Sequence, residues 1–418
     1  MDASLPRPHT ATRQGWAGAA RFAGPGLLVS VGYMDPGNWA TDIEAGSRYG
    51  YALLFVVALS SLAALYLQTR AARLGLVTGR DLAQLCRERY SRPASLALWA
   101  GAEVAIIACD IAEVLGAALA LKLLLHLPLW AGVLLTGLDT LIVLVLQGRG
   151  MRRLEAAVLA LVVTIAAAFV VELAFFPPDW SAAAHGLLPT GLVARDPHAL
   201  YLAIAIVGAT VMPHNLYLHS ALVRARSDTP IHTALRWTTL DVAAALGIAM
   251  LVNAAILVLA ASAFRHATPP VTEIDQAYRL LTPLAGTGAA ALLFGVALLA
   301  SGQSSTITGT LAGQVILEGF LGVELPLWQR RAITRALAIL PALAGVLWLG
   351  DDSVGRLLVL TQVALSLQLP FAIWPMLRFS GDAKLMREHA DGGAARLVGW
   401  GLFAAITAAN LWLLAETL

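Results

Sequence analysis

The chain has 418 residues, of which 58% are hydrophobic and only 13% are charged, with a net charge of +2. Soluble domains contain about 25% charged residues. Apolar runs of about 20 residues, each long enough to cross a bilayer, recur here from end to end. This composition excludes a soluble enzyme, a disordered chain and a nucleic-acid-binding protein, and it indicates an all-α polytopic membrane protein.

Residues 1–21 are polar and contain no apolar segment of a cleaved signal peptide, so we interpret them as a cytoplasmic N-terminal tail. Cys86 and Cys109 are too few and too far apart for a disulfide framework or a zinc site. We expect no cofactor and no obligate protein partner.

The charge-poor stretches predict eleven membrane spans. Their limits are 22–46, 49–69, 94–121, 127–148, 154–177, 199–223, 237–264, 282–317, 332–350, 357–377 and 397–416. The first five spans form one block over 22–177 and the next five form a second block over 199–377, with the eleventh span in 397–418. Because five is odd, the second block must enter the membrane upside down relative to the first.

The arginine distribution predicts the orientation. With the N-terminus inside, most of the 28 lysine and arginine residues lie in the inner loops, as the positive-inside rule requires. The stretch 280–317 has no charged residue and could hold two spans, but a second span would place Arg330, Arg331 and Arg335 outside. We therefore predict one long helix there, a cytoplasmic N-terminus and an extracytoplasmic C-terminus.

Two predicted spans contain sequences that no continuous helix in lipid tolerates. The first span has DPGN at 35–38 and the sixth has MPHN at 212–215, each in mid-membrane. Proline lacks an N–H, glycine is a poor helix former, and a charged aspartate is costly in lipid. One such break is compatible with an ordinary proline kink. Two breaks, each in the first helix of its block, favour an inverted-repeat transporter with its substrate site at the midplane.

The breaks expose a mixed set of potential ligands: the Asp35 carboxylate, the Asn38 amide oxygen, the Met212 sulfur and carbonyls near Ala209 and Gly32. Oxygen ligands alone suit Mg²⁺ or Ca²⁺, whereas a thioether adds affinity for softer ions such as Mn²⁺, Fe²⁺, Co²⁺ and Cd²⁺. The carbonyls that end the first half of the sixth span also present the negative pole of a helix dipole. The alternative for Met212 is a core methionine that fills a gap.

The segments VGYMDPGNWAT and GATVMPHNLYLHS resemble the two signature segments of the Nramp family of proton-coupled divalent metal transporters, which includes bacterial manganese-uptake proteins. ACDIAEVLG, ASGQSSTITGTLAGQ and TQVALSLQLPFA extend the resemblance over essentially the whole chain. It implies a LeuT-type 5+5 inverted repeat with broken helices 1 and 6. It also implies metal ligands at Asp35, Asn38, Met212 and the Ala209 carbonyl, with Gln362 joining when the site closes. Gly32 replaces the alanine that many relatives carry, although its carbonyl is retained.

Three acids of the third span are candidates for a proton path. Spacings of 7 and 3 place Glu103, Asp110 and Glu113 on one helical face, and acids inside a membrane are functional by default. Arg331 and Arg335, at i and i+4 in the ninth span, are candidate counter-charges. The alternative is a static network of buried ion pairs.

Histidine titrates near working pH, so His214 and His219 beside the second break are further candidates, although His219 could equally be a satisfied core histidine. The resemblance implies a proton route from Asp35 toward Asp110 and Glu113, to which His214 and Glu103 contribute. For Asp139, Glu172 and Asp241 we predict structural or interfacial roles.

The sequence and the resemblance together predict import of divalent metal ions with protons by alternating access, in a bacterial inner membrane. Partners would be the metal ions, protons and the lipid bilayer. A sodium-coupled amino-acid symporter of the same architecture remains an alternative, but Asp35 would repel a substrate carboxylate. A channel and a membrane enzyme are further alternatives, and the chain has neither a His-Glu-x-x-His motif nor a serine nucleophile elbow.

Overall fold

The computed structural model describes residues 24–138, 150–224, 230–323, 325–350 and 353–417, and within these ranges the regular structure is entirely helical. Nine helical stretches of the described chain are long and apolar enough to cross a membrane. A helix lies at the place of each of the eleven predicted spans, but only Leu129–Leu138 of the fourth span is described. The count of eleven therefore stays a prediction.

The long helices follow one another through the chain with short helices between them. They are α4 (Leu54–Thr78), α6 (Arg92–Leu125), α9 (Met151–Phe175), α14 (Ile231–Phe264), α16 (Gly288–Leu321), α17 (Leu327–Leu349), α18 (Val354–Ser380) and α20 (Gly393–Thr417). The two broken spans are α2 (Pro25–Ser30), η1 (Val31–Met34) and α3 (Pro36–Tyr49) for the first, and α12 (Pro197–Val211) and α13 (Pro213–Val223) for the sixth.

The first break lies where the sequence places it. Asp35 is extended and caps α3, accepting a hydrogen bond from the Asn38 backbone N–H, while Pro36 occupies the first helical position, where it loses no helical hydrogen bond. The freed carbonyls before the break bind hydroxyls of α16: Ser301 donates to the Met34 carbonyl and Thr308 donates to the Leu28 carbonyl. Unwound backbone is therefore satisfied by protein, as it must be inside a membrane.

The second break has a strained residue at its centre. Met212 lies between α12 and α13 with φ 33° and ψ 107°, a left-handed region that residues other than glycine rarely adopt. Such a conformation costs about 1–3 kcal/mol and persists only where its surroundings enforce it. Met212 is fully buried, and Pro213 starts α13 directly after it. The strain turns the end of α12 and the methionine side chain toward the first break.

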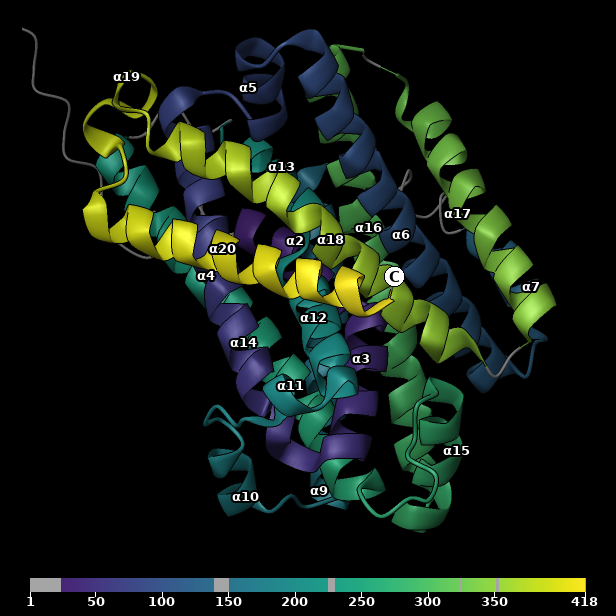
Figure 1. Cartoon of the computed structure of the whole chain (residues 1–418). Helices are drawn as coiled ribbons and strands as arrows, with labels where there is room; N and C mark the ends of the chain where they lie inside the picture. The colour runs from purple at the N-terminus through teal and green to yellow at the C-terminus, as the bar shows by residue number, and fades with distance from the viewer. Residues whose placement is uncertain (1–23, 139–149, 225–229, 324, 351–352, 418) are drawn as a thin grey trace, which may run out of the picture.

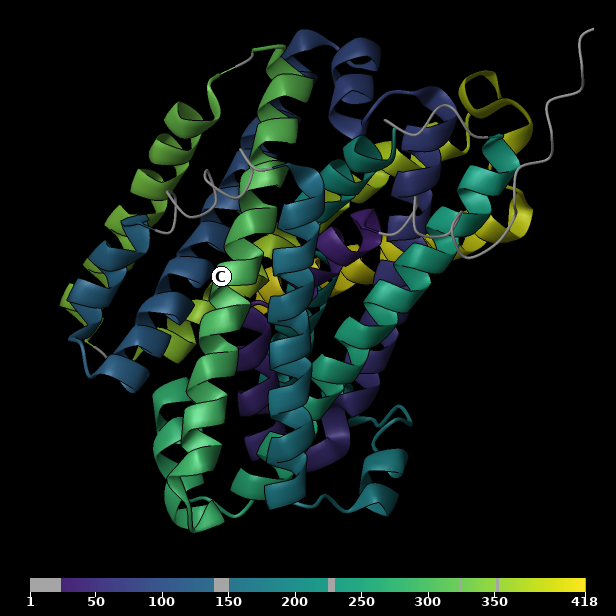
Figure 2. The same cartoon turned by 180° about the vertical axis from the view of Figure 1, so that it is seen from behind.

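The broken helices form the centre of the bundle (Figures 1 and 2). α3 packs against α14 and α12, α13 packs against α4 and α16, and α6 packs along α16. α2 and α13 extend toward the end of the bundle that carries the short helices α5 (Leu82–Arg89) and α19 (Ala383–Met386), whereas α3 and α12 extend toward the end with α10 (Trp180–His185) and α15 (Ile274–Ala285) (Figure 1). α17 and α7 (Leu129–Leu135) lie together on the outside.

Two predicted boundaries are wrong for identifiable reasons. The span predicted at 49–69 continues as α4 to Thr78, because Arg70 bonds Asp391 at 2.5 Å and Arg73 lies 3.8 Å from the same carboxylate. The span predicted at 282–317 begins only at Gly288. Gly286, with φ 68°, ends the short α15, and Thr287 caps α16 through its hydroxyl. The charge-free stretch therefore contains one membrane-length helix preceded by the end of a short one.

Candidate metal-binding site

The two breaks meet at the Asn38 side chain. Its Nδ2 atom donates to Asp35 Oδ1 at 2.7 Å and to the Ala209 carbonyl oxygen at 3.2 Å. One N–H₂ group therefore holds together two of the oxygen ligands that the sequence predicts, one from each broken helix. A cation placed between these oxygens would replace that donor and satisfy the same negative charge.

Asn253 on α14 completes this arrangement, and the sequence analysis missed it. Its Nδ2 atom donates to Asn38 Oδ1 at 3.1 Å, so the oxygen of the predicted amide ligand is turned away from Asp35. Both side chains are buried. Asn253 is the one polar residue in the apolar stretch 242–261 of α14, and this was the available signal, since a buried amide in a membrane needs a partner.

The soft ligand lies beside the first break. A Cβ atom at Gly32 would lie 3.1 Å from Met212 Sδ and would collide with the Asn215 side chain. Asn215 Nδ2 contacts Met212 Sδ at 3.6 Å. The absence of a side chain at Gly32 thus lets Met212 and the Asn215 amide approach the first broken helix. Gly32 therefore has a packing role in addition to the predicted role of its carbonyl as a ligand. Asn215 is a second polar residue that the ligand prediction did not include.

Gln362 of α18 reaches the same centre from a third direction. A Cβ atom at Gly37 would collide with the Gln362 side-chain amide, so this side chain lies directly against the start of α3. Its Nε2 atom donates to Thr361 Oγ1 at 3.0 Å, while its Oε1 atom has no hydrogen-bond partner among the described residues. Gly208 allows this approach, because a Cβ there would collide with the Gln362 carbonyl.

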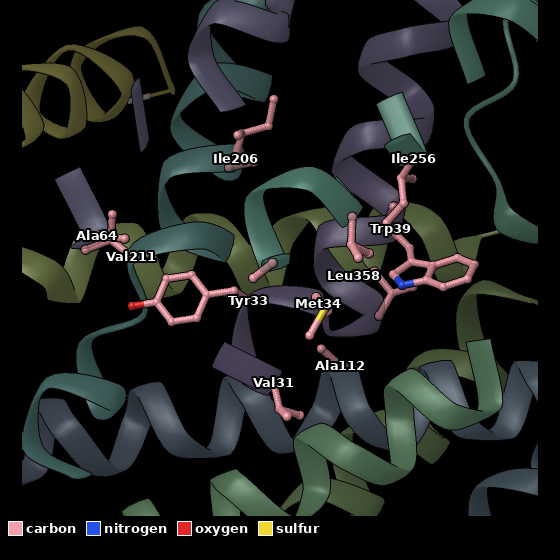
Figure 3. Close-up of a cluster of buried hydrophobic side chains, with 14 of the residues drawn as sticks. Val31, Tyr33, Met34, Trp39, Ala64, Ala112, Ile206, Val211, Ile256 and Leu358 are labelled. Atoms are coloured by element: carbon pink, nitrogen blue, oxygen red, sulfur yellow. The ribbon is translucent and has the colours of Figure 1, made fainter. Parts of the chain in front are cut away.

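The site is enclosed by protein and still has unpaired oxygens. Asp35, Met212, Ala209 and Gln362 are fully buried, and Asn38 is 1% exposed. Within the described ranges, Asp35 Oδ2 and Gln362 Oε1 make no hydrogen bond. Buried oxygen atoms without donors are unfavourable unless a cation or proton satisfies them. Figure 3 shows buried hydrophobic side chains near the first break, among them Tyr33, Met34, Trp39, Ala112, Ile206 and Ile256.

The predicted acid face of α6 is paired with α17. Glu103 Oε1 lies 3.2 Å from Arg330 Nη2 and accepts a bond from the Trp99 indole N–H at 3.1 Å. Glu113 Oε2 lies 3.8 Å from Arg335 Nη1. Arg335 thus lies within ion-pair distance of Glu113. The partner of Glu103 is Arg330, which the sequence analysis used only to orient the chain.

Asp110 and Glu113 both face α16 at Gly309. A Cβ there would lie 2.9 Å from Glu113 Oε1 and 3.3 Å from Asp110 Oδ1. Arg331 donates to the Thr306 carbonyl of α16 at 3.2 Å and is 5% exposed, so its charge is also held beside these acids. Two carboxylates and two guanidinium groups therefore share one buried region.

This acid region adjoins the first break. Pro36 packs so closely on α6 that a Cβ at Gly116 would collide with its ring, and Gly116 is one turn from Glu113. The Cys109 thiol donates to Glu113 Oε1 at 3.6 Å. The first break, which contains Asp35, therefore packs against α6 one turn away from the paired acids.

The two histidines have different surroundings. His219 Nδ1 lies 3.0 Å from Gln68 Oε1, and Gln68 Nε2 donates to the Tyr33 hydroxyl at 2.8 Å. This series of hydrogen bonds links α13, α4 and η1. His214 follows the second break directly and is 1% exposed, and no hydrogen bond of its Nδ1 atom is seen in the described part of the chain. The described hydrogen bond of His219 is therefore with Gln68 of α4.

The remaining membrane acids lie elsewhere. Asp241 of α14 accepts hydrogen bonds from the backbone N–H groups of Gly24 and Gly26, so it caps the start of α2 and has the structural role predicted for it. Glu172 is buried in α9. Asp139 lies outside the described residues.

Two interrupted helices in corresponding places, packed around buried polar groups, define a transporter of the LeuT type. The chain shares this fold with a nucleobase-cation-symport-1 family transporter, at a TM-score of 0.63 and 15% identity over 94% of this chain and 91% of that one. A likeness at this identity concerns the fold alone.

The sequence model of the Nramp family, described as natural resistance-associated macrophage protein-like, matches residues 26–416, and the chain belongs to this family. It is 58% identical to the divalent metal cation transporter MntH of Ralstonia nicotianae over 96% of this chain and 92% of that protein. Its structure matches the manganese transporter of Eremococcus coleocola at a TM-score of 0.88, with 37% identity over 98% of this chain and 88% of the other. These relatives are named as transporters and not as enzymes.

Proposed function

We propose that this protein imports divalent transition metal ions, Mn²⁺ first and also Fe²⁺, Co²⁺ and Cd²⁺, together with protons. The observation that carries the proposal is the meeting of Asp35 Oδ1 and the Ala209 carbonyl on one Asn38 donor, with Met212 and Gln362 at the same centre. One carboxylate, neutral oxygens and a thioether form a set for a divalent ion of intermediate softness. The names of the relatives support the same substrate class.

In this mechanism the ion enters from the outer side and displaces the Asn38 amide N–H₂ from Asp35 and Ala209. Rotation of the Asn38 amide then presents its oxygen to the ion, while Met212 contributes sulfur and Gln362 closes the site. Because a bound cation favours ionised Asp35, the proton of that carboxyl leaves. An inside-negative membrane potential contributes about 2.3 kcal/mol per charge per 100 mV, so a divalent ion is driven inward.

The released proton passes from Asp35 to the acids of α6. Asp110 and Glu113 are the first acceptors, because the Asp35 break packs one turn from Glu113. Arg331 and Arg335 stabilise the ionised acids, and Glu103 with Arg330 continues the path along the same face. His214 contributes beside Met212, and His219 contributes through Gln68 and Tyr33. α2, α3, α12 and α13 then rock against the surrounding helices to release the metal.

The orientation and location belong to the same proposal. The arginine-rich loops favour a cytoplasmic position for the end with α5 and α19, which would leave the C-terminus outside. We propose the inner membrane of a bacterium as the location. The burial of every candidate ligand supports alternating access, in which the same site opens to each side in turn.

The test is Mn²⁺ uptake into proteoliposomes that contain the purified chain and an internal pH dye, for the wild type and Asp35→Asn. We expect uptake with acidification in the wild type and the loss of both in the variant. Uptake without acidification would retain the metal site and reject proton coupling. No uptake by folded wild type, with stimulation by sodium and amino acids instead, would support the amino-acid symporter.

A further inference from the structure

A basic cavity lies where the end of α18 meets the start of α20. Its volume is about 570 Å³, and its lining includes Arg89, Arg378 and Arg396 together with Tyr90, Asp382 and Trp400. The end of α18 and the start of α20, which line it, lie at the end of the bundle that carries α5 and α19 (Figure 1). It is separate from the candidate metal site, to which α18 contributes only Gln362, 16 residues before Arg378.

The charges in this cavity are not balanced. Asp382 is the one acidic residue of the lining, and its carboxylate lies 4.0 Å from the Arg89 guanidinium, at the limit of an ion pair. Arg378 and Arg396 are exposed, and within the described ranges neither lies within 4.0 Å of a carboxylate. Arg396 interacts with Asp391 at longer range, and that carboxylate is already paired with Arg70. The cavity therefore has an excess positive charge, which fits an anionic group such as a phosphodiester.

The cavity continues into an apolar surface of membrane-facing side chains. Leu360, Phe371 and Trp374 are 55%, 59% and 43% exposed, and they follow one face of α18 that ends at Arg378. Trp374 and Trp400 meet edge to face with ring centroids 5.0 Å apart, and Phe403 of α20 lies 5.5 Å from both rings. Tryptophan prefers the boundary between headgroups and acyl chains, so these rings mark the depth of that boundary.

We propose that this cavity binds the headgroup of an anionic phospholipid, with the phosphodiester at Arg378 and Arg396 and the acyl chains along the exposed face of α18. A lipid satisfies both halves of the surface, whereas a soluble anion would satisfy only the arginines. The N-terminal segment 1–21 is excluded as an occupant by charge, because it carries Arg7, Arg13 and Arg21 against a single Asp2. Basic pockets between membrane helices bind anionic headgroups in the same way.

The test is native mass spectrometry of the delipidated full chain with added phosphatidylglycerol or phosphatidylcholine. The wild type should retain phosphatidylglycerol preferentially. In the double variant Arg378→Gln/Arg396→Gln, the affinity for phosphatidylglycerol should fall about 30-fold, because each arginine near anionic lipid contributes about 1 kcal/mol and about 1.4 kcal/mol corresponds to tenfold. Arg356→Gln removes the same charge from the opposite end of α18 and should change nothing.

Three outcomes would overturn the proposal: equal retention of the two lipids by the wild type, unchanged phosphatidylglycerol affinity in the double variant, or the same loss in Arg356→Gln. Displacement of phosphatidylglycerol by a tenfold excess of inorganic phosphate would assign the cavity to a soluble anion instead. The unfolding temperature without lipid controls for folding, and it should be the same for all variants because the substituted arginines are exposed.

Discussion

The side-chain amide of Asn253 on α14 donates a hydrogen bond of 3.1 Å to the Asn38 oxygen on α3. As a result the Asn38 N–H₂ group faces Asp35 and Ala209, in the place where a cation would bind. Asn38 must rotate for its oxygen to become a ligand. Asn253 can accept from the rotated amide, because its own Oδ1 atom makes no hydrogen bond within the described chain. The two amides therefore form a pair that can reverse together when metal binds.

Replacement of Asn253 should change the balance between the two orientations of the Asn38 amide, and therefore the affinity for Mn²⁺. In Asn253→Asp the unrotated Asn38 oxygen loses its donor, whereas the rotated Asn38 N–H₂ group keeps an acceptor. A buried hydrogen bond worth about 1–1.5 kcal/mol is then lost only in the metal-free state, so Mn²⁺ binding should be roughly tenfold tighter. In Asn253→Leu each state loses one hydrogen bond, so the affinity should stay within about threefold of wild type. Isothermal titration with Mn²⁺ measures both constants. Equal affinity in Asn253→Asp and the wild type would mean that Asn38 rotates without help from α14.

Removal of the Met212 sulfur should change ion selectivity. Met212→Ala leaves only oxygen ligands, so Ca²⁺ or Mg²⁺ should compete with Mn²⁺ for uptake, whereas neither competes in the wild type. Met34→Leu is the matched control, because Met34 is equally buried beside the first break but is not a predicted ligand. Competition assays with radioactive Mn²⁺ would show the difference. Unchanged selectivity in Met212→Ala would make the methionine a packing residue.

Neutralisation of Glu113 should reduce proton transport more than metal binding. Glu113→Gln keeps the shape of the side chain that contacts Cys109 and Arg335 but cannot accept a proton. We expect Mn²⁺ affinity within about threefold of wild type and a loss of at least tenfold in internal acidification during uptake. Glu172→Gln, an equally buried acid on α9, should alter neither. Parallel losses of metal binding and acidification in Glu113→Gln would indicate a structural role.

The Glu103–Arg330 pair should stabilise the contact between α6 and α17. Arg330 is buried and Glu103 is partly buried, so removal of one partner leaves an uncompensated charge and costs up to about 3 kcal/mol. Glu103→Gln and Arg330→Gln should each lower the unfolding temperature in detergent, and the double variant should recover part of the loss. Additive effects of the two substitutions would show that the two side chains do not interact in the folded protein.

The sequence alone determined the class of the protein and the places of the two breaks, and it supplied the chemical types of the candidate ligands. Apolar runs, prolines and glycines act locally, so their consequences do not depend on distant contacts. DPGN had to interrupt its helix in any fold, and a capping aspartate at position 35 follows from its place before Pro36. Helical spacing likewise predicted that Glu103, Asp110 and Glu113 share one face.

Only the tertiary structure decided which groups meet across helices. Periodicity gives the face of one helix but not the neighbour that covers it, so Asn253, Asn215 and the pairing of Glu103 with Arg330 could not be foreseen. The same reason explains His219, whose partner Gln68 lies 151 residues away in the chain. Close approach at Gly32 and Gly37 determines how Met212 and Gln362 reach the first break, and these contacts exist only once the two repeats are packed together.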